Sequence, residues 1–319
     1  MESSHPNPAI HAVANTLRIN AATAEVLRAF AAAGIESLVL KGPAIARWLY
    51  SDDDPRYYVD SDLLVRPSDI PGAQECLRLL GFENQFDDSS MPEWWREHGS
   101  EWWRASDRVL VDLHRTLPGV GIDPGQAWAV LSSSTEVTTI AGQSAPILGL
   151  PARTLHVVLH AGHHGAAWGG PIADLERAIA RVELPVWRDA ATLAERLEAT
   201  DALSAGLRLT APGEALAAAL GLPSPRSVGA VLRASSPPPV ALGFEQLASA
   251  RNARERAAIV WRKLLPPASF IRHWQPEGTE TRRGLALAYL RRPLWILRHA
   301  PAALRSWRAA RRHVRHGGS

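Results

Sequence analysis

The spacing of hydrophobic residues differs between the first and the second half of the chain. Up to about residue 150, short apolar runs typical of strands interleave with stretches in which apolar residues recur at helical spacing. From Ala152 onward the spacing is helical and strong helix formers dominate. The pattern therefore predicts a mixed α/β domain followed by a helical domain.

The elements expected in the first half are helices over 11–33, 44–50 and 68–80, strands over 35–40, 57–65 and 108–117, and a short hairpin within 134–150. The strand over 108–117 is expected to form a hairpin of its own, because Ser106-Asp107 before it is a turn signal. Residues 83–105 show no regular period and are expected to be irregular. The chain is thereby divided into an N-terminal helical segment (1–34), an α/β core (35–150), a helical domain (151–280) and a basic amphipathic tail (281–319).

Composition narrows the class of protein. Hydrophobic residues make up 46% of the 319 positions and charged residues 21%, which suits a folded core and excludes a disordered chain. Cys76 is the single cysteine, so no internal disulfide is expected and a reducing compartment fits. The first residues lack a signal-peptide pattern, and no apolar run reaches the roughly 18 residues of a membrane span. We expect a cytoplasmic protein, either free or peripheral at a membrane.

Charge is unevenly placed, although the net charge is only +3. From Thr281 to Ser319 the chain has ten arginines and no acidic residue, which is typical of a surface that contacts an anionic partner. The candidate partners are an anionic membrane, a partner protein and a nucleic acid, and the alternative is a basic helix that is simply packed on its domain and solvated. The apolar residues expected to contact a membrane are Trp295, Ile296, Leu297, Leu304 and Trp307. Nucleic acid is not expected as a partner, because no nucleic-acid signature motif is present.

Two aspartates two positions apart are the main candidates for chemistry. Asp60 and Asp62 lie in a predicted strand, so both side chains point to one face, about 7 Å apart. Asp112 lies between apolar neighbours in a second predicted strand, where aspartate is equally unusual. A divalent cation resolves the repulsion between such carboxylates, and Mg²⁺ prefers their oxygens. If the strands are adjacent, the three carboxylates suit two-metal phosphoryl or nucleotidyl transfer.

A Lys41-Gly42 turn joins a buried strand to a helix. Glycine allows close backbone approach, a helix N-terminus favours anions, and lysine adds positive charge, so the turn suits a triphosphate. The alternative is an ordinary strand-to-helix turn. The paired aspartates have a similar alternative, since exposed aspartates at the end of a strand are common.

A series of motifs makes the chain similar to a known family. VLKGPAIARWLY is followed by R-x-x-x-D-S-D-L-L-V-R-P-S-D, by CLRLLGF and by VLVDLHRTL, and the order holds from about Ser37 to Leu117. In the helical half, LHAGHHGAAWGGPIADLERAI carries His160, His164 and Asp174. This series resembles the uncharacterised bacterial nucleotidyltransferases of the DNA polymerase beta type.

The resemblance implies an α+β fold, in which a polymerase-beta-like core of mixed sheet and flanking helices precedes a helical domain. It implies transfer of a nucleoside monophosphate from a nucleoside triphosphate to an acceptor hydroxyl on a small molecule, a peptide or a protein. Mg²⁺, or Mn²⁺ in its place, would be held by Asp60, Asp62 and Asp112. Lys41 and Gly42 fall on the phosphate turn of the wider superfamily, but Lys-Gly and a longer gap before the aspartates depart from its pattern.

The remaining candidates each have a structural alternative. Arg56 either binds the γ-phosphate or pairs with Asp52, Asp53 or Asp54. His114 shares a face with Asp112, where it either orients that carboxylate, acts on the acceptor hydroxyl or is a structural histidine. His160 and His164 share a helix face, and we expect them to line the nucleotide cleft or pack a domain interface rather than bind zinc. The paired tryptophans either stack on a base or sugar, or form a hairpin core; they are Trp94, Trp95, Trp102 and Trp103.

Three functions are thus open. The first is an active nucleotidyltransferase, the second is a pseudoenzyme that keeps the fold and binds a nucleotide or a partner, and the third is a membrane-associated scaffold in a biosynthetic complex. The complete set of Asp60, Asp62 and Asp112 favours the first, because a pseudoenzyme more often loses one carboxylate.

Overall fold

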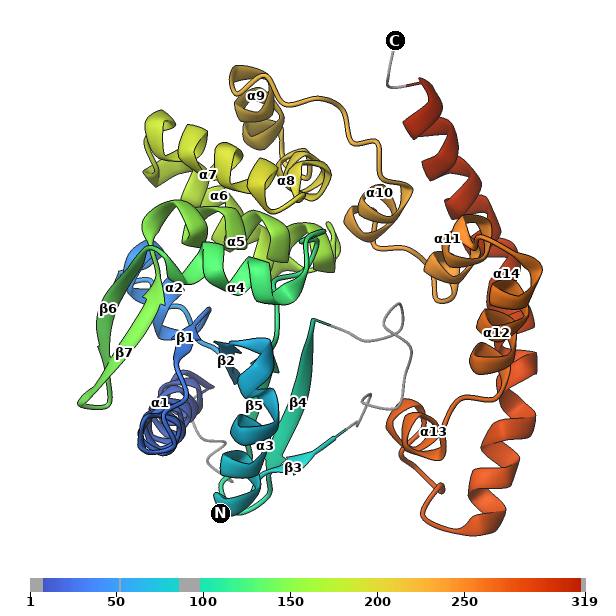
Figure 1. The fold of residues 1–319 in the computed structure, drawn as a ribbon, viewed down its shortest axis with the longest axis horizontal. Coiled ribbons are helices and arrows are strands. Elements are labelled where there is room, and N and C mark those ends of the chain that lie inside the picture. The colour runs from blue at the N-terminus through green and yellow to red at the C-terminus, as the bar shows by residue number, and fades with distance from the viewer. Residues whose placement is uncertain (1–7, 52, 86–97, 317–319) are drawn as a thin grey trace, which may run out of the picture. The chain divides into compact units, whose positions relative to one another are not determined.

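The computed structural model describes residues 8–51, 53–85 and 98–316, which belong to two compact units (Figure 1). The first unit comprises Met1–Val157 and Asp174–Ala199, and the second comprises Val158–Ala173 and Thr200–Ser319. The boundaries between the units after Val157 and after Ala173 both fall inside helices. The division of the chain into four parts at residues 34, 150 and 280 stays a prediction.

Among the described residues, a mixed sheet of seven strands forms the centre of the first unit. Its strands are β1 (Ser37–Val39), β2 (Asp60–Val65), β3 (Glu83–Asn84), β4 (Gly99–Arg104), β5 (Val109–His114), β6 (Thr135–Ile140) and β7 (Gln143–Leu148). The strand order is β3-β4-β5-β2-β1-β7-β6. The pairs β2–β5 and β1–β7 are parallel, whereas the other neighbours are antiparallel. The expected mixed sheet with flanking helices is confirmed.

Helices cover this sheet. They are α1 (Pro8–Ala32), α2 (Pro43–Leu49), a 3₁₀ turn at Pro67–Asp69, α3 (Ile70–Leu79), α4 (Pro124–Ser132), the first part of α5 (Leu150–His164), the last part of α6 (Gly169–Arg181) and α7 (Leu184–Arg196). Phe30 of α1 and Leu77 of α3 pack in one core with Leu63 and Val65 of β2. Thr23 of α1 also donates a hydrogen bond to Ser61 at 2.9 Å. Because strand side chains alternate, the even-numbered residues of β2 face away from α1.

One expectation in this unit was wrong. Residues 83–105 were expected to be irregular, yet the described part contains β3 and β4, and β4 pairs with β5 in the expected hairpin. The strand GSEWWR lacks a clear alternation because consecutive tryptophans occupy both faces; Trp102 is fully buried and packs in the core. The prediction that the tryptophans form a hairpin core is therefore confirmed for Trp102, whereas Trp94 and Trp95 lie outside the described residues.

The second unit is helical in its described part, as its spacing predicts. Its remaining helices are α8 (Thr200–Leu207), α9 (Ala211–Ala219), α10 (Val228–Ala234), α11 (Ala241–Ser249), α12 (Ala253–Leu264), α13 (Ala268–Trp274) and α14 (Arg282–His316). Leu232 and Ala241 pack with Ala303 and Trp307 in a small core. Of the helices in the described ranges, none combines the length and the apolar character that a membrane crossing requires.

Candidate active site

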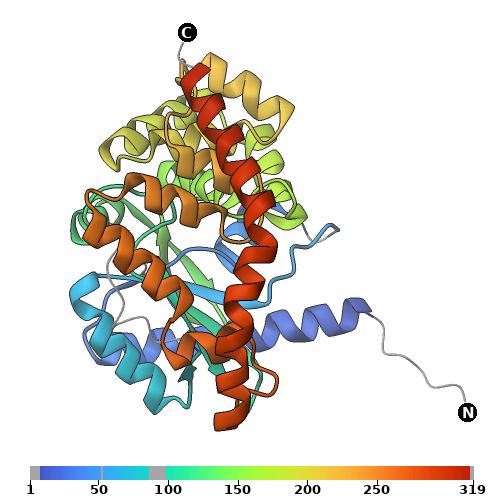
Figure 2. The same ribbon diagram turned by 90° about the vertical axis from the view of Figure 1, so that its right-hand side faces the viewer.

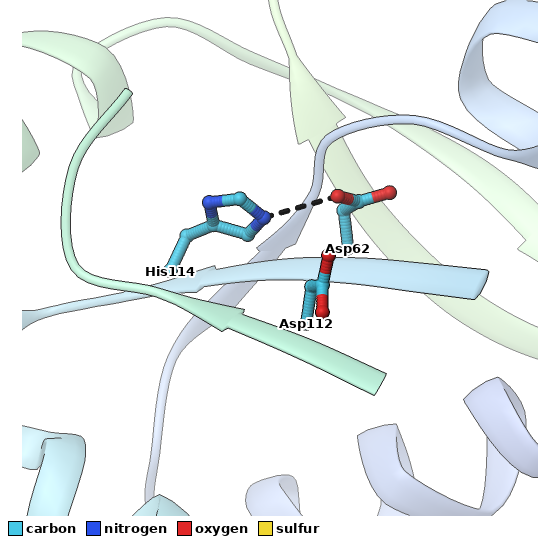
Figure 3. A group of neighbouring side chains, drawn as sticks. All are labelled: Asp62, Asp112 and His114. Atoms are coloured by element: carbon cyan, nitrogen blue, oxygen red, sulfur yellow. Dashed lines mark hydrogen bonds and ion pairs between the residues drawn. The ribbon is translucent and has the colours of Figure 1, made fainter. Parts of the chain in front are cut away.

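Parallel pairing of β2 with β5 brings two carboxylates together. The register places Asp62 beside Asp112 and Leu64 beside His114. These residues share the face of the sheet opposite α1, and Figure 3 shows Asp62, Asp112 and His114 converging there. The sequence places aspartate in both strands, and the register makes the two aspartates neighbours.

Asp62 is the most enclosed member of the group, with no exposed surface. Its Oδ1 atom lies 2.6 Å from Lys41 Nζ and 3.0 Å from His114 Nε2. One oxygen of this carboxylate thus accepts from a lysine at the end of β1 and contacts an imidazole on β5. Lys41 and His114 are brought to Asp62 by strands on either side of β2.

The other oxygens of the pair fit a divalent cation. One ligand atom each from Asp62, Asp112 and His114 lies within 4.8 Å of the others. Asp62 Oδ2 and Asp112 Oδ1 are buried, and neither has a hydrogen-bond partner among the described residues. A buried oxygen without a partner is destabilising, and a cation bound between the carboxylates would supply the missing partner. Carboxylate oxygens are ligands that suit Mg²⁺ and Mn²⁺.

Asp60 stands beside this group rather than in it. It is half-buried at the start of β2, on the same face as Asp62, and opposite Leu110 in the register. The structure therefore brings Asp62, Asp112 and His114 within ligand distance, whereas the sequence predicted Asp60, Asp62 and Asp112. Asp60 remains close enough that its charge acts on Asp112 and Lys41, and its role as a metal ligand stays a prediction.

The pKa values of the three aspartates are shifted by burial and by their neighbours' charges. Burial alone would raise the pKa of Asp62, but Lys41 and His114 together hold that pKa well below its usual range. Burial and the charges of Asp62 and Asp60 raise the pKa of Asp112 to about 8. Burial and the charge of Asp62 likewise raise the pKa of Asp60. Without a cation, the site therefore keeps a proton on Asp112 at neutral pH.

Lys41 lies among these carboxylates. Burial would lower its pKa, but the charges of Asp62 and Asp60 raise it, so the ammonium stays charged. Gly42 follows with a φ of 57°, and a Cβ there would meet the Tyr58 ring at 3.4 Å. The left-handed backbone explains why glycine occupies this turn. Binding of a triphosphate by the turn stays a prediction.

Arg56 belongs to a second, separate network. Its Nε atom lies 2.9 Å from Asp174 Oδ1 and its Nη2 atom 2.9 Å from Asp174 Oδ2, while Tyr50 Oη donates to Oδ1 at 2.6 Å. Burial and the bond to Asp174 raise the pKa of Tyr50 to about 12. In the acidic loop, Asp54 pairs with Arg177, and Asp52 lies outside the described residues. Asp174 therefore fixes the guanidinium of Arg56 just before β2, and γ-phosphate binding by Arg56 stays a prediction.

His156 was missed by the sequence reasoning. It lies on α5, is fully buried and is near enough to Lys41, Asp62 and His114 to feel their charges. Burial and the charge of Lys41 lower its pKa to about 3, so it is neutral at pH 7. The available signal was its position four residues before His160 on one helix face.

His160 and His164 belong to the second unit. Their rings meet edge to face with centroids 4.5 Å apart, and His164 also contacts Trp168 at 5.2 Å. The structure thus places them against each other and against an aromatic side chain. Their predicted contact with a nucleotide stays a prediction.

One family model matches the greater part of the chain. A family described as uncharacterised nucleotidyltransferase matches residues 9–212. The antibiotic-resistance factor ANT(2'')-Ia is similar in structure, with 18% identity, a TM-score of 0.39, and 55% of this chain and 90% of that chain covered. An antigenic nucleotidyltransferase-like protein from Paracoccidioides brasiliensis is similar at 15% identity and a TM-score of 0.35, over 57% and 93% of the two chains. No curated protein matches the chain.

Proposed function

Since this chain belongs to the family of uncharacterised nucleotidyltransferases, we propose that it moves a nucleoside monophosphate from a nucleoside triphosphate to an acceptor hydroxyl. The observation that supports the proposal is the pair of buried oxygens, Asp62 Oδ2 and Asp112 Oδ1, that have no partner among the described residues. Unpartnered carboxylate oxygens on neighbouring strands suit a cation that also binds triphosphate.

In the proposed reaction, the acceptor oxygen forms a bond with the α-phosphorus of the nucleotide. The bond between the α-phosphorus and the bridging oxygen breaks, pyrophosphate leaves, and the hydroxyl proton is released. The chemistry that Mg²⁺ or Mn²⁺ would supply, when bound, is positive charge at the phosphates and easier deprotonation of the hydroxyl. Asp62 and Asp112 would hold the cation, and Asp60 offers a third carboxylate on the same face.

The surrounding residues have supporting roles in this proposal. His114 Nε2 lies 3.0 Å from Asp62 Oδ1 and orients that carboxylate. Lys41 supplies positive charge beside the carboxylates, where the phosphates of the nucleotide would lie. Asp174 holds Arg56 in place, which makes a charged contact to the nucleotide less costly in side-chain entropy.

The proposal extends to partners. The nucleotide is one substrate, and the acceptor is a small molecule, a peptide or a protein. An anionic membrane surface or a protein partner is assigned to residues 281–319, where acidic residues are absent from the sequence.

Calorimetric titration of ATP, GTP, CTP and UTP, with and without Mg²⁺, tests the proposal without a known acceptor. Asp62→Asn and Asp112→Asn remove ligand charge with little change of shape, and Asp53→Asn makes the same change on an exposed residue outside the site. We expect Mg²⁺-dependent binding of at least one nucleotide, lost in the first two variants and kept in the third. Metal-independent binding that all three variants retain would indicate a nucleotide-binding pseudoenzyme instead, and absence of binding by the wild type would count against the proposal.

A further inference from the structure

The long helix α14 presents two different faces. On one face, Ala288, Arg292, Ala303 and Ala310 are buried in the second unit. Arg292 Nε donates to the Lys263 carbonyl at 2.8 Å, and its guanidinium lies over the Phe270 and Trp274 rings. Figure 2 shows the full length of this helix, coloured orange to red. The buried face anchors α14 to α10, α11, α12 and α13.

The opposite face carries leucines into solvent. Leu287, Leu290, Leu294 and Leu297 are 45%, 72%, 68% and 66% exposed. Their spacing of three, four and three residues places them on one side of the helix. The same spacing continues through exposed Pro301, Arg305, Arg308 and Arg312. We call this side the leucine–arginine face, defined by Leu287, Leu290, Leu294, Leu297, Pro301, Arg305, Arg308 and Arg312.

The structure changes which residues a partner would meet. Of the five apolar residues expected from the sequence to contact a membrane, only Leu297 is exposed. Trp307 Nε1 instead donates to Glu245 Oε2 at 2.7 Å, and Trp295 packs on Trp274 with centroids 5.4 Å apart. The tryptophans therefore hold α14 to its own unit, and the leucines are the apolar side chains that remain available.

Charge surrounds this apolar stripe. Arg291 and Arg298 are exposed beside the leucines, and Arg283 and Arg315 are exposed toward the two ends of the helix. No acidic residue occurs from Thr281 to Ser319. A second copy of the helix would bring arginines against arginines without an acidic residue on either helix to pair them. A nucleic acid would explain the arginines but would leave four leucines against phosphates or in water.

We propose that the leucine–arginine face of α14 docks on an anionic membrane surface, with the helix lying in the plane of the interface. The leucines enter the boundary between headgroups and acyl chains, and the arginines stay with the lipid phosphates. The face is complementary to such a surface in both charge and apolar character. The inference does not rest on nucleotidyl transfer and concerns a different unit from the carboxylates.

Flotation of the full-length protein with vesicles tests this docking. Vesicles of phosphatidylcholine alone are compared with vesicles that contain roughly 30% phosphatidylglycerol, at low and high salt. The test variant is Leu290→Glu/Leu294→Glu, and Leu17→Glu makes the same substitution on an exposed leucine of α1. Point substitutions are used because deletion of α14 would expose the core that it covers. Thermal melting of each variant confirms that these exposed changes leave the fold intact.

We expect the wild type and Leu17→Glu to float with the anionic vesicles only, and to detach as salt rises. The double variant should bind about tenfold less or weaker still, because two charges replace its central apolar contacts. Absence of wild-type flotation, or equal flotation of the double variant, would overturn the proposal. The proposal would also be overturned if the wild type sedimented as a dimer without binding vesicles and the double variant sedimented as a monomer. The face would then contact a second copy of the chain.

Discussion

The two strongly charged regions of this protein handle like charges in opposite ways. In the first unit, a strand register places Asp62 beside Asp112, and Asp62 is fully buried while Asp112 is half-buried. In the second unit, the arginines of α14 are spread along one helix and most face solvent. Water and salt screen the arginines, whereas Lys41, His114 and a proton offset the charge of the two carboxylates among the described residues. The carboxylate cluster therefore suits a specific ion, and the exposed face suits an additive, less specific attraction.

A buried ion pair in the first unit gives the largest expected effect. Asp174→Ala should lower the free energy of unfolding by about 3–5 kcal/mol, because it leaves the Arg56 guanidinium buried without its partner. Glu36→Gln removes the exposed partner of Arg66 and should change stability by less than about 0.5 kcal/mol. Urea unfolding measures both. Equal values would show that burial does not separate the two kinds of charge.

Asp112→Asn should raise the free energy of unfolding, whereas Asp174→Ala should lower it. The pKa of Asp112 is about 8 in the folded protein against an ordinary 3.8, so the folded state holds a proton that the unfolded state has lost. Stability should therefore fall as pH rises from about 4 through about 8, and this slope should be absent in the variant. At pH 7 the metal-free variant should be more stable by roughly 2–4 kcal/mol, while its Mg²⁺ binding is lost. A destabilised variant would mean that the carboxylates do not repel.

Metal affinity should depend on pH for the same reason. Because Asp112 is protonated below about pH 8 and a metal needs the carboxylate, Mn²⁺ affinity should fall about tenfold for each pH unit below 8. Above pH 8 the affinity should level off. Calorimetry at several pH values measures this directly, and two buffers with different ionisation enthalpies reveal the released proton. A flat profile from pH 6 to pH 8 would assign the metal to other ligands.

Much of this could be read from the sequence, and the failures have physical causes. The strands with Asp60, Asp62 and Asp112 and the helices of the second half follow from hydrophobic period and local propensity. His114 and His156 were harder to place, because their position beside Asp62 depends on which strands and helices are neighbours. Strand pairing is a long-range property that periodicity does not carry.

The C-terminal helix α14 also has a feature that the sequence does not predict, namely which of its faces is exposed. Its sequence carries tryptophans, leucines and arginines close together, and sequence reasoning gave the tryptophans a place in the membrane-contacting set. Only packing decides that Trp307 turns toward Glu245 while Leu290 and Leu294 face solvent. The sequence predicted an amphipathic helix, but it did not predict that the leucine–arginine face is the exposed one.

The smallest expected effect of a single substitution concerns the exposed arginines. Each basic residue near an anionic surface contributes about 1 kcal/mol, so Arg305→Gln should weaken vesicle binding roughly fivefold, and Arg305→Gln/Arg308→Gln roughly 25-fold. The two effects should add, because screened charges that share no partner act independently. Arg18→Gln on α1 changes an exposed arginine outside the face and should leave binding unchanged. Flotation at a fixed low salt measures all three variants. A loss that appears in full with the first substitution would indicate a specific pocket, and the contrast with the carboxylate cluster would then disappear.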